Sequence, residues 1–154
     1  MNVSWNVTKQ CFLLSYVCCL GITLSGCSQD DGRLSLHGTV TFDGTPLPTG
    51  NIKFFPQSGT PGPTAGGPIE DGSFSIAADG GTMPGNFRIE ITATRKTGNK
   101  VYDSTAEMMD PSVKDGMVDE IEQYIPARYN QNSNLTADVH SDGDNHFEFV
   151  LQSS

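Results

Sequence analysis

The sequence has no cysteine after residue 27, although it runs to residue 154. Small exported domains that depend on disulfides carry cysteines throughout their folded part, so that class of protein is excluded here. No two of the four cysteines have the Cys-x-x-Cys spacing of zinc and redox sites. The four are Cys11, Cys18, Cys19 and Cys27.

Basic residues are also scarce, with nine Lys and Arg against 18 Asp and Glu and a net charge of −9. A protein that binds nucleic acid needs clustered Lys and Arg to contact phosphates, so we expect no nucleic-acid partner. Gly and Pro number 17 and 9. Their combined share is above average but below the roughly 25–30% that marks low-complexity disorder. The composition therefore predicts a turn-rich globular domain.

Long apolar runs are absent except for one near the N-terminus. Residues 11–23 (CFLLSYVCCLGIT) form a run of 13 uncharged, mainly apolar residues. A helix needs about 20 such residues to span a bilayer, so this run is too short. Its length is instead typical of the central region of a secretory signal peptide. The pattern predicts an exported protein.

Residues 24–27 (LSGC), directly after this run, resemble a bacterial lipobox. The resemblance implies that residues 1–26 are a signal peptide, that Cys27 is lipidated, and that residues 27–33 form the lipidated cysteine and a polar tether. The mature chain then has a net charge of −10, so the lipid and not charge attaches it to the membrane. Ser28 after the cysteine favours the outer membrane, on its periplasmic or cell-surface side. The alternative is an ordinary signal peptide cleaved elsewhere, with Cys27 incidental.

After residue 33 the dominant pattern is an alternation of apolar and polar residues, the period of a strand with one buried face. Seven short strands separated by turn residues predict a β-sandwich. We therefore expect an all-β fold, a single seven-stranded sandwich over residues 34–152. The seven segments lie at 34–42, 51–56, 64–69, 74–76, 87–93, 135–139 and 147–151.

Residues 96–125 break this pattern and are too long for an ordinary hairpin loop. Met117 and the apolar residues four, seven and eight positions later suit a helix that starts near Asp115 and ends at Pro126. The competing interpretation is an extended segment, 120–125, paired along a sheet edge. The seven acidic residues of this excursion predict a solvated, charged flank that discourages edge-to-edge association. The alternative role for the acidic excursion is contact with a partner or a divalent ion.

Three motifs resemble a known family. Residues 38–48 (GTVTFDGTPLP) resemble the first hairpin of carboxypeptidase regulatory-like domains, which are also described as transthyretin-like or prealbumin-like. Residues 71–76 (DGSFSI) resemble the Asp-Gly-x-Phe hairpin of that family, and residues 84–89 (PGNFRI) resemble its Pro-Gly-x-Tyr/Phe motif. Order and spacing fit over about residues 34–95. The resemblance implies an immunoglobulin- or prealbumin-like sandwich that serves as a structural or adhesive module and is generally non-catalytic.

The residues of these motifs have structural roles and no reactive ones. Gly44 and Gly72 follow aspartates in turns that require a positive φ, where a Cβ would be unfavourable. Phe74 and Phe87 alternate with polar neighbours and are expected to be buried in the core.

Candidate catalytic residues are limited to three histidines, His37, His140 and His146. Hydrolases of 5-hydroxyisourate share the transthyretin-like fold, but their C-terminal Tyr-Arg-Gly-Ser is not matched by the end of this sequence, Val-Leu-Gln-Ser-Ser. The sequence also lacks a Gly-x-Ser-x-Gly elbow and a His-Glu-x-x-His zinc motif. We therefore expect no catalytic residues, no cofactor and no enzymatic activity.

Asp142 and Asp144 offer hard oxygen ligands, yet the run Asp-Gly-Asp-Asn at 142–145 is also what a hairpin turn requires. A turn is the preferred interpretation, and a metal site at these two aspartates is the alternative. The whole sequence thus predicts a non-enzymatic, lipid-anchored cell-envelope protein with a structural or binding β-sandwich. The alternative function is a small-ligand module for a divalent metal or a glycan. The single tryptophan, Trp5, lies in the expected signal peptide, so the mature chain would have none to offer a glycan, which weakens that alternative.

Overall fold

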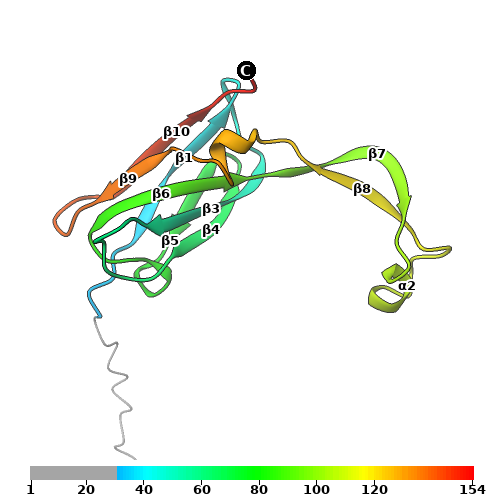
Figure 1. Ribbon diagram of the computed structural model, residues 1–154, viewed down its shortest axis with the longest axis horizontal. Helices are drawn as coiled ribbons and strands as arrows, with labels where there is room; N and C mark the ends of the chain where they lie inside the picture. The colour runs from blue at the N-terminus through cyan, green and yellow to red at the C-terminus, as the bar shows by residue number, and fades with distance from the viewer. Residues whose placement is uncertain (1–30) are drawn as a thin grey trace, which may run out of the picture. The chain divides into compact units, whose positions relative to one another are not determined.

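The computed structural model describes residues 31–154, which form one unit and are built almost entirely of strands (Figure 1). The all-β prediction is confirmed. The expected signal peptide and the lipidated Cys27 lie outside the described residues. In chain order the strands are β1 (Leu36–Phe42), β2 (Thr45–Pro46), β3 (Thr49–Pro56), β4 (Ala65–Glu70), β5 (Ser73–Ile76), β6 (Gly85–Thr92), β7 (Thr94–Tyr102), β8 (Met117–Gln123), β9 (Thr136–Val139) and β10 (His146–Leu151). The helical segments are η1 (Ala78–Gly80), α2 (Ala106–Met109) and η2 (Ala127–Tyr129).

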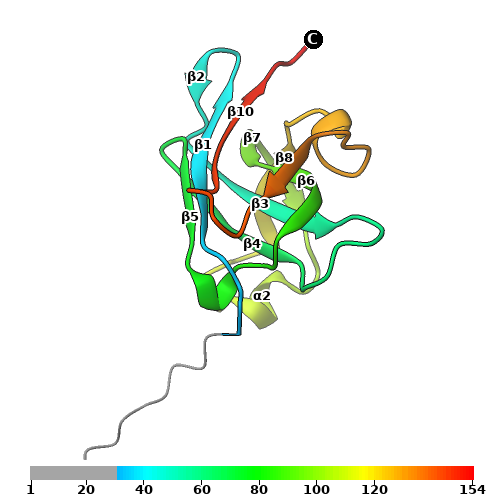
Figure 2. The same ribbon diagram turned by 90° about the vertical axis from the view of Figure 1, so that its left-hand side faces the viewer.

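Eight of these strands form one curled sheet, in the order β10-β1-β5-β4-β3-β6-β9, with β2 paired to β1. Neighbours run antiparallel except for β1 and β10, which are parallel with Val40 opposite Phe149. Strands β9 and β10 lie at opposite ends of this order, yet Val139 and Leu151 belong to the same buried cluster. The sheet therefore curls around its own inner face (Figures 1 and 2).

The core is made by the alternate residues that the strands turn inward. Phe54 is its centre: its ring centroid lies 6.0 Å from that of Phe74, 6.5 Å from that of Phe87 and 5.8 Å from that of Phe147. The predicted burial of Phe74 and Phe87 is confirmed. Burying one such side chain contributes about 1.5–3 kcal/mol, so this cluster is a main source of stability.

Two tight hairpin turns have the conformation that their Asp-Gly pairs predict. Asp43 and Gly44 have φ values of 49° and 80°, and Asp71 and Gly72 have 48° and 77°. Each pair forms a two-residue loop between strand residues that face each other, the geometry of a type I′ turn. Both turns end at a glycine because that position needs a left-handed backbone.

Each of the seven predicted strand segments contains a strand, and the described residues hold three more: β2, β7 and β8. The helix expected from about Asp115 to Pro126 is wrong, because β8 is extended and pairs antiparallel with β7. The extended interpretation is confirmed for residues 120–123, but the partner is β7 and not an edge of the main sheet. Cross-strand pairing of charged side chains favours strand over helix here.

We call residues 94–123 the arm. Its two strands form a sheet of their own, which extends away from the main sheet in Figure 1. Every residue of β7 is exposed. At the base of the arm, Gln123 Oε1 accepts the backbone N–H groups of Ala93 at 3.0 Å and Ile125 at 3.1 Å. Since Ala93 and Ile125 are both buried in the core, the base of the arm is attached to the folded body.

Candidate binding surface

The structure brings two of the three histidines together and leaves the third apart. His37 and His146 are opposite each other on the parallel strands β1 and β10, with ring centroids 5.3 Å apart. His37 Nε2 lies 3.7 Å from Asp144 Oδ1, whereas His140 Nε2 lies 3.6 Å from Asp138 Oδ2. These are exposed contacts on the outside of the sheet and not an enclosed site. Within residues 31–154, no group of three or more His, Cys, Asp or Glu residues could hold a metal ion.

The run 142–145 forms the turn between β9 and β10, and Asn145 shapes it. Asn145 Oδ1 accepts the backbone N–H of His140 at 2.9 Å, and its Nδ2 donates to the His140 carbonyl oxygen at 3.0 Å. Asn145 is buried and has a φ of 47°, which Asn tolerates better than most residues. The turn interpretation of Asp142 and Asp144 thus has a structural basis, with an asparagine as its main determinant.

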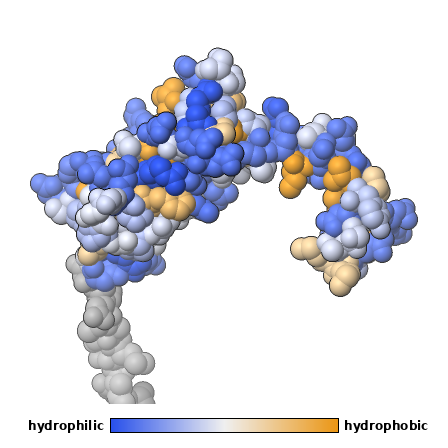
Figure 3. Space-filling model, viewed as in Figure 1, coloured by the Kyte–Doolittle hydropathy of each residue, from blue (hydrophilic) through white to orange (hydrophobic). Residues whose placement is uncertain are grey.

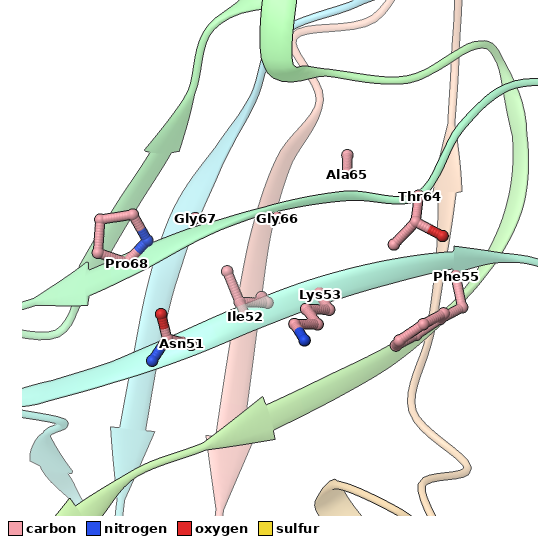
Figure 4. Close-up of a pocket in the computed structure, with 9 residues that line it drawn as sticks. All are labelled: Asn51, Ile52, Lys53, Phe55, Thr64, Ala65, Gly66, Gly67 and Pro68. Carbon is pink, nitrogen blue, oxygen red and sulfur yellow. The ribbon is translucent and has the colours of Figure 1, made fainter.

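One hollow of the sheet surface, of about 380 Å³, lies over β3 and β4 (Figure 4). Gly66 and Gly67 are part of its lining, where β4 presents backbone and no side chain. Its polar side chains are Asn51, Lys53 and Thr64, so the lining offers one amine, one amide and one hydroxyl. The lining contains no carboxylate and no imidazole.

A second hollow, of about 410 Å³, lies at the base of the arm. The rings of Phe42 and Tyr124 meet edge to face there at 5.6 Å, and the Arg95 guanidinium lies 5.2 Å from the centre of the Tyr124 ring. Arg95 is the one charged residue of this lining.

The acidic residues of β8 pair with basic residues of β7. Asp119 accepts the ammonium of Lys100 at 2.6 Å and that of Lys96 at 2.5 Å, and Arg95 Nε lies 2.6 Å from Glu122 Oε1. The hydrogen bonds from Lys100 and Lys96 lower the pKa of Asp119 to about 2, and the bond to Asp119 raises the pKa of Lys96. The prediction of a charged flank therefore needs correction along β8, where these acids join the two strands.

Glu120 completes this cross-strand set where the two strands lose their regular register. Its Oε2 accepts the hydroxyl of Thr97 at 2.6 Å and the amide of Asn99 at 3.1 Å, and these bonds lower the pKa of Glu120. A two-stranded sheet alone is marginally stable in water. The exposed arm has no core, so hydrogen bonds and ion pairs between its two strands contribute to its stability instead.

Exposed apolar side chains are concentrated on the arm (Figure 3). Among residues 31–154, seven large hydrophobic residues are exposed, and six of these lie between residues 94 and 123. Monomeric proteins rarely expose contiguous apolar surface without an interaction role. The six are Val101, Tyr102, Met108, Met109, Met117 and Ile121.

Three of the six lie on one face of the arm. Tyr102 is directly opposite Met117 in the β7–β8 ladder, and Lys96 is opposite Ile121. Residues two apart on a strand share a face, so Met117 and Ile121 point to the same side as Tyr102, with Asp119 between them. The face is apolar at both ends and carries the paired Lys96, Lys100 and Asp119 charges in its middle.

The sequence indicates an excursion at residues 96–125, but it does not predict that the excursion exposes apolar side chains. The pair Met108-Met109 is the sequence feature that indicates an apolar surface, because these two adjacent residues lie among acids and belong to no apolar alternation. Periodicity could not show that they remain exposed. Cys27, the predicted lipidation site, is outside the residues described.

The helices of residues 31–154 all fall short of the length and apolar character needed to cross a bilayer. Comparisons of the chain with protein-family models, with curated proteins and with solved structures found no match.

Proposed function

We propose that this chain is a non-enzymatic, lipid-anchored protein of the bacterial cell envelope whose β-sandwich presents the arm as a binding element. The observation that carries the binding role is the concentration of exposed apolar side chains on the arm, six of the seven among the described residues. The hollows on the sheet surface are open and carry few charged side chains, whereas the arm gathers most of the exposed apolar side chains, so the arm is the surface best suited to recognition.

We infer that the curled sheet is a prealbumin-like sandwich of the carboxypeptidase regulatory-like kind. Support comes from the seven predicted strands, which all occur and pack around one core. The two Asp-Gly hairpins of the family motifs have the required positive φ values at Asp43-Gly44 and Asp71-Gly72. The parallel pairing of β1 with β10 also agrees with a sandwich whose first and last strands are neighbours.

Membrane attachment through Cys27 is the other half of the proposal. The LSGC motif at 24–27 and the apolar run before it support it. A mature chain of net charge −10 gains nothing from an anionic lipid surface, so acyl chains on Cys27 would provide the affinity. An anchored sandwich would then hold the arm at the membrane surface, within reach of other envelope proteins.

Fractionation of cells that express the full chain tests the anchoring. We expect the wild type in the membrane pellet, resistant to a high-salt wash and released by detergent. Cys27→Ala should move to the soluble fraction, because the lipid attachment is lost. Cys19→Ala is the matched control and should behave as the wild type, since it changes a cysteine that would leave with the signal peptide. A Cys27→Ala chain that stays in the pellet would overturn the proposal.

A further inference from the structure

The tip of the arm, residues 103–116, presents two methionine side chains beside four carboxylates. Met108 and Met109 are 86% and 82% exposed, the highest values for large hydrophobic side chains in the part of the chain described. We propose that this tip docks into another envelope protein, in an apolar groove bordered by Lys and Arg. This inference rests on the proposed function, because it names the class of partner that the arm would bind.

Hydrogen bonds within the tip define its conformation. Asp103 Oδ1 accepts the backbone N–H of Thr105 at 2.8 Å, and Asp110 Oδ1 accepts that of Ser112 at 2.9 Å. The backbone N–H of Asp103 donates to the carbonyl of Gly116 at 2.8 Å, which closes the base of the tip. A surface held in its binding conformation loses less conformational entropy on association. The methionines are thus presented on a formed surface.

Ala106 shows which side of the short helix α2 faces inward. It is 5% exposed, whereas Met108 and Met109 on the same helix point to solvent. The side chains of Met108 and Met109 are therefore directed outward, where a partner can contact them. Methionine is unbranched and polarisable, which suits it to fill a groove of irregular shape.

The charge of the tip selects the chemistry of the groove. Residues 103–116 contain four acids and one base, a net charge of −3. Hydrogen bonds from Thr105 and Ser112 lower the pKa values of Asp103 and Asp110, which favours the ionised forms of both carboxyl groups. Complementary potentials steer partners together and suppress wrong ones, so a border of Lys and Arg fits this tip. The acids are Asp103, Glu107, Asp110 and Asp115, and the base is Lys114.

The same charge disfavours two other occupants. Two copies of this chain would bring identical acidic tips together, which like-charge repulsion opposes. An anionic bilayer would also repel the tip, since each unit of charge near such a surface is worth about 1 kcal/mol. A basic protein groove remains the occupant that satisfies both the methionines and the carboxylates.

Site-specific photo-crosslinking in intact cells tests the proposal with the full-length chain. Benzoylphenylalanine replaces Met108, and in a control chain it replaces Val150, which is 66% exposed on β10 and distant from the arm in sequence. We expect an adduct with a different protein at position 108 and not at position 150. Mass spectrometry of the adduct should map it to a peptide with Lys or Arg beside apolar residues.

A charge variant within the tip sharpens the test. Glu107→Lys should lower the yield of the adduct at position 108 several-fold, and Glu107→Gln should lower it less. An adduct with lipid, an adduct with a second copy, or no adduct above the level at position 150 would each overturn the docking proposal. The membrane pellet of the same cells is assayed in parallel, so a chain that is anchored but forms no adduct shows that docking alone has failed.

Discussion

Asp119 on β8 joins Lys96 and Lys100 of β7, with the two ammonium groups 2.5 Å and 2.6 Å from its carboxylate oxygens. The β7–β8 ladder shifts register between these two lysines. A single carboxylate therefore connects the regular pairing on both sides of the irregularity. Because the arm has no core of its own, this contact is one of the specific links between its strands, and it lies on the face that carries Tyr102, Met117 and Ile121.

The arm should lose order at acid pH before the body does. The folded-state pKa of Asp119 is about 2, against an ordinary value of 3.8. An acid with a lowered folded-state pKa contributes stability that is complete above its unfolded pKa and is lost as the pH falls through the folded value. The window thus runs from about pH 4 to about pH 2.

Carboxyl chemical shifts and amide exchange measure this effect. The Asp119 carboxyl should titrate well below pH 3.8. Amides of β7 and β8 should exchange faster in this window, while those of β3 and β6 should not. In Asp119→Asn the arm should exchange faster at neutral pH and show a smaller further change in the window, whereas Glu148→Gln on β10 should leave the arm unaffected. An ordinary titration of Asp119 near pH 3.8 would show that the ion pairs do not form.

Removal of a central aromatic should destabilise the body. Phe87 is fully buried and packs on Phe54, so Phe87→Ala should lower the free energy of unfolding by about 3–5 kcal/mol. Urea denaturation measures the loss. The matched control is Val150→Ala on the exposed side of β10, which should stay within about 0.5 kcal/mol of the wild type. Equal effects of the two changes would contradict the described core.

Glycine at position 38 is required by the pairing of the first and last strands. A Cβ at Gly38 would lie 1.9 Å from the carbonyl oxygen of Phe147, a backbone atom that cannot move without breaking the β1–β10 ladder. Gly38→Ala should therefore cost more than the roughly 1–3 kcal/mol of ordinary overpacking. Gly80→Ala is the control, because its nearest contact would be a side-chain carbon at 3.5 Å. Similar melting temperatures for both variants would exclude this parallel pairing.

The amount of structure that the sequence predicts depends on whether a residue is buried. Phe87, Ile89 and Ile91 alternate because one face of β6 lies against the core, so the period of two predicts that strand directly. The Asp-Gly pairs predict their turns equally well, because local backbone conformation alone determines them.

The arm could not be predicted in this way. All nine residues of β7 are exposed, so no apolar period marks the strand. On β8, Met117 and Ile121 have the i, i+4 spacing of a helix, and no buried face is present to enforce the period of a strand. Its pairing depends on contacts such as Arg95 with Glu122, which lie 27 residues apart in the sequence. Apolar residues are also normally expected inside, so only the fold reveals Met108 and Met109 as surface residues.

In the turn between β9 and β10, we expect Asn145 to be required for stability and Asp142 and Asp144 to be dispensable. Asn145→Ala removes both bonds to the His140 backbone and should cost about 1–3 kcal/mol, because partly buried backbone groups lose their partner. The double change Asp142→Asn with Asp144→Asn should be mild, since Asn keeps an acceptor and tolerates turn conformations. Thermal melting with and without millimolar calcium checks both. A melting temperature that rises with calcium only when both aspartates are present would instead establish a metal site.

The central claim is that another envelope protein binds the tip of the arm. Oxidation of the tip methionines by hydrogen peroxide, followed residue by residue with mass spectrometry, tests this claim most directly. Exposed thioethers oxidise readily to sulfoxides, so Met108 and Met109 should react fast in the purified full-length protein, and the partly buried Met83 should react slowly. In intact cell envelopes, Met108 and Met109 should react several-fold more slowly while Met83 is unchanged, and Glu107→Lys should restore the fast reaction. Equal rates at Met108 and Met109 in both preparations, or protection that survives Glu107→Lys, would contradict the account.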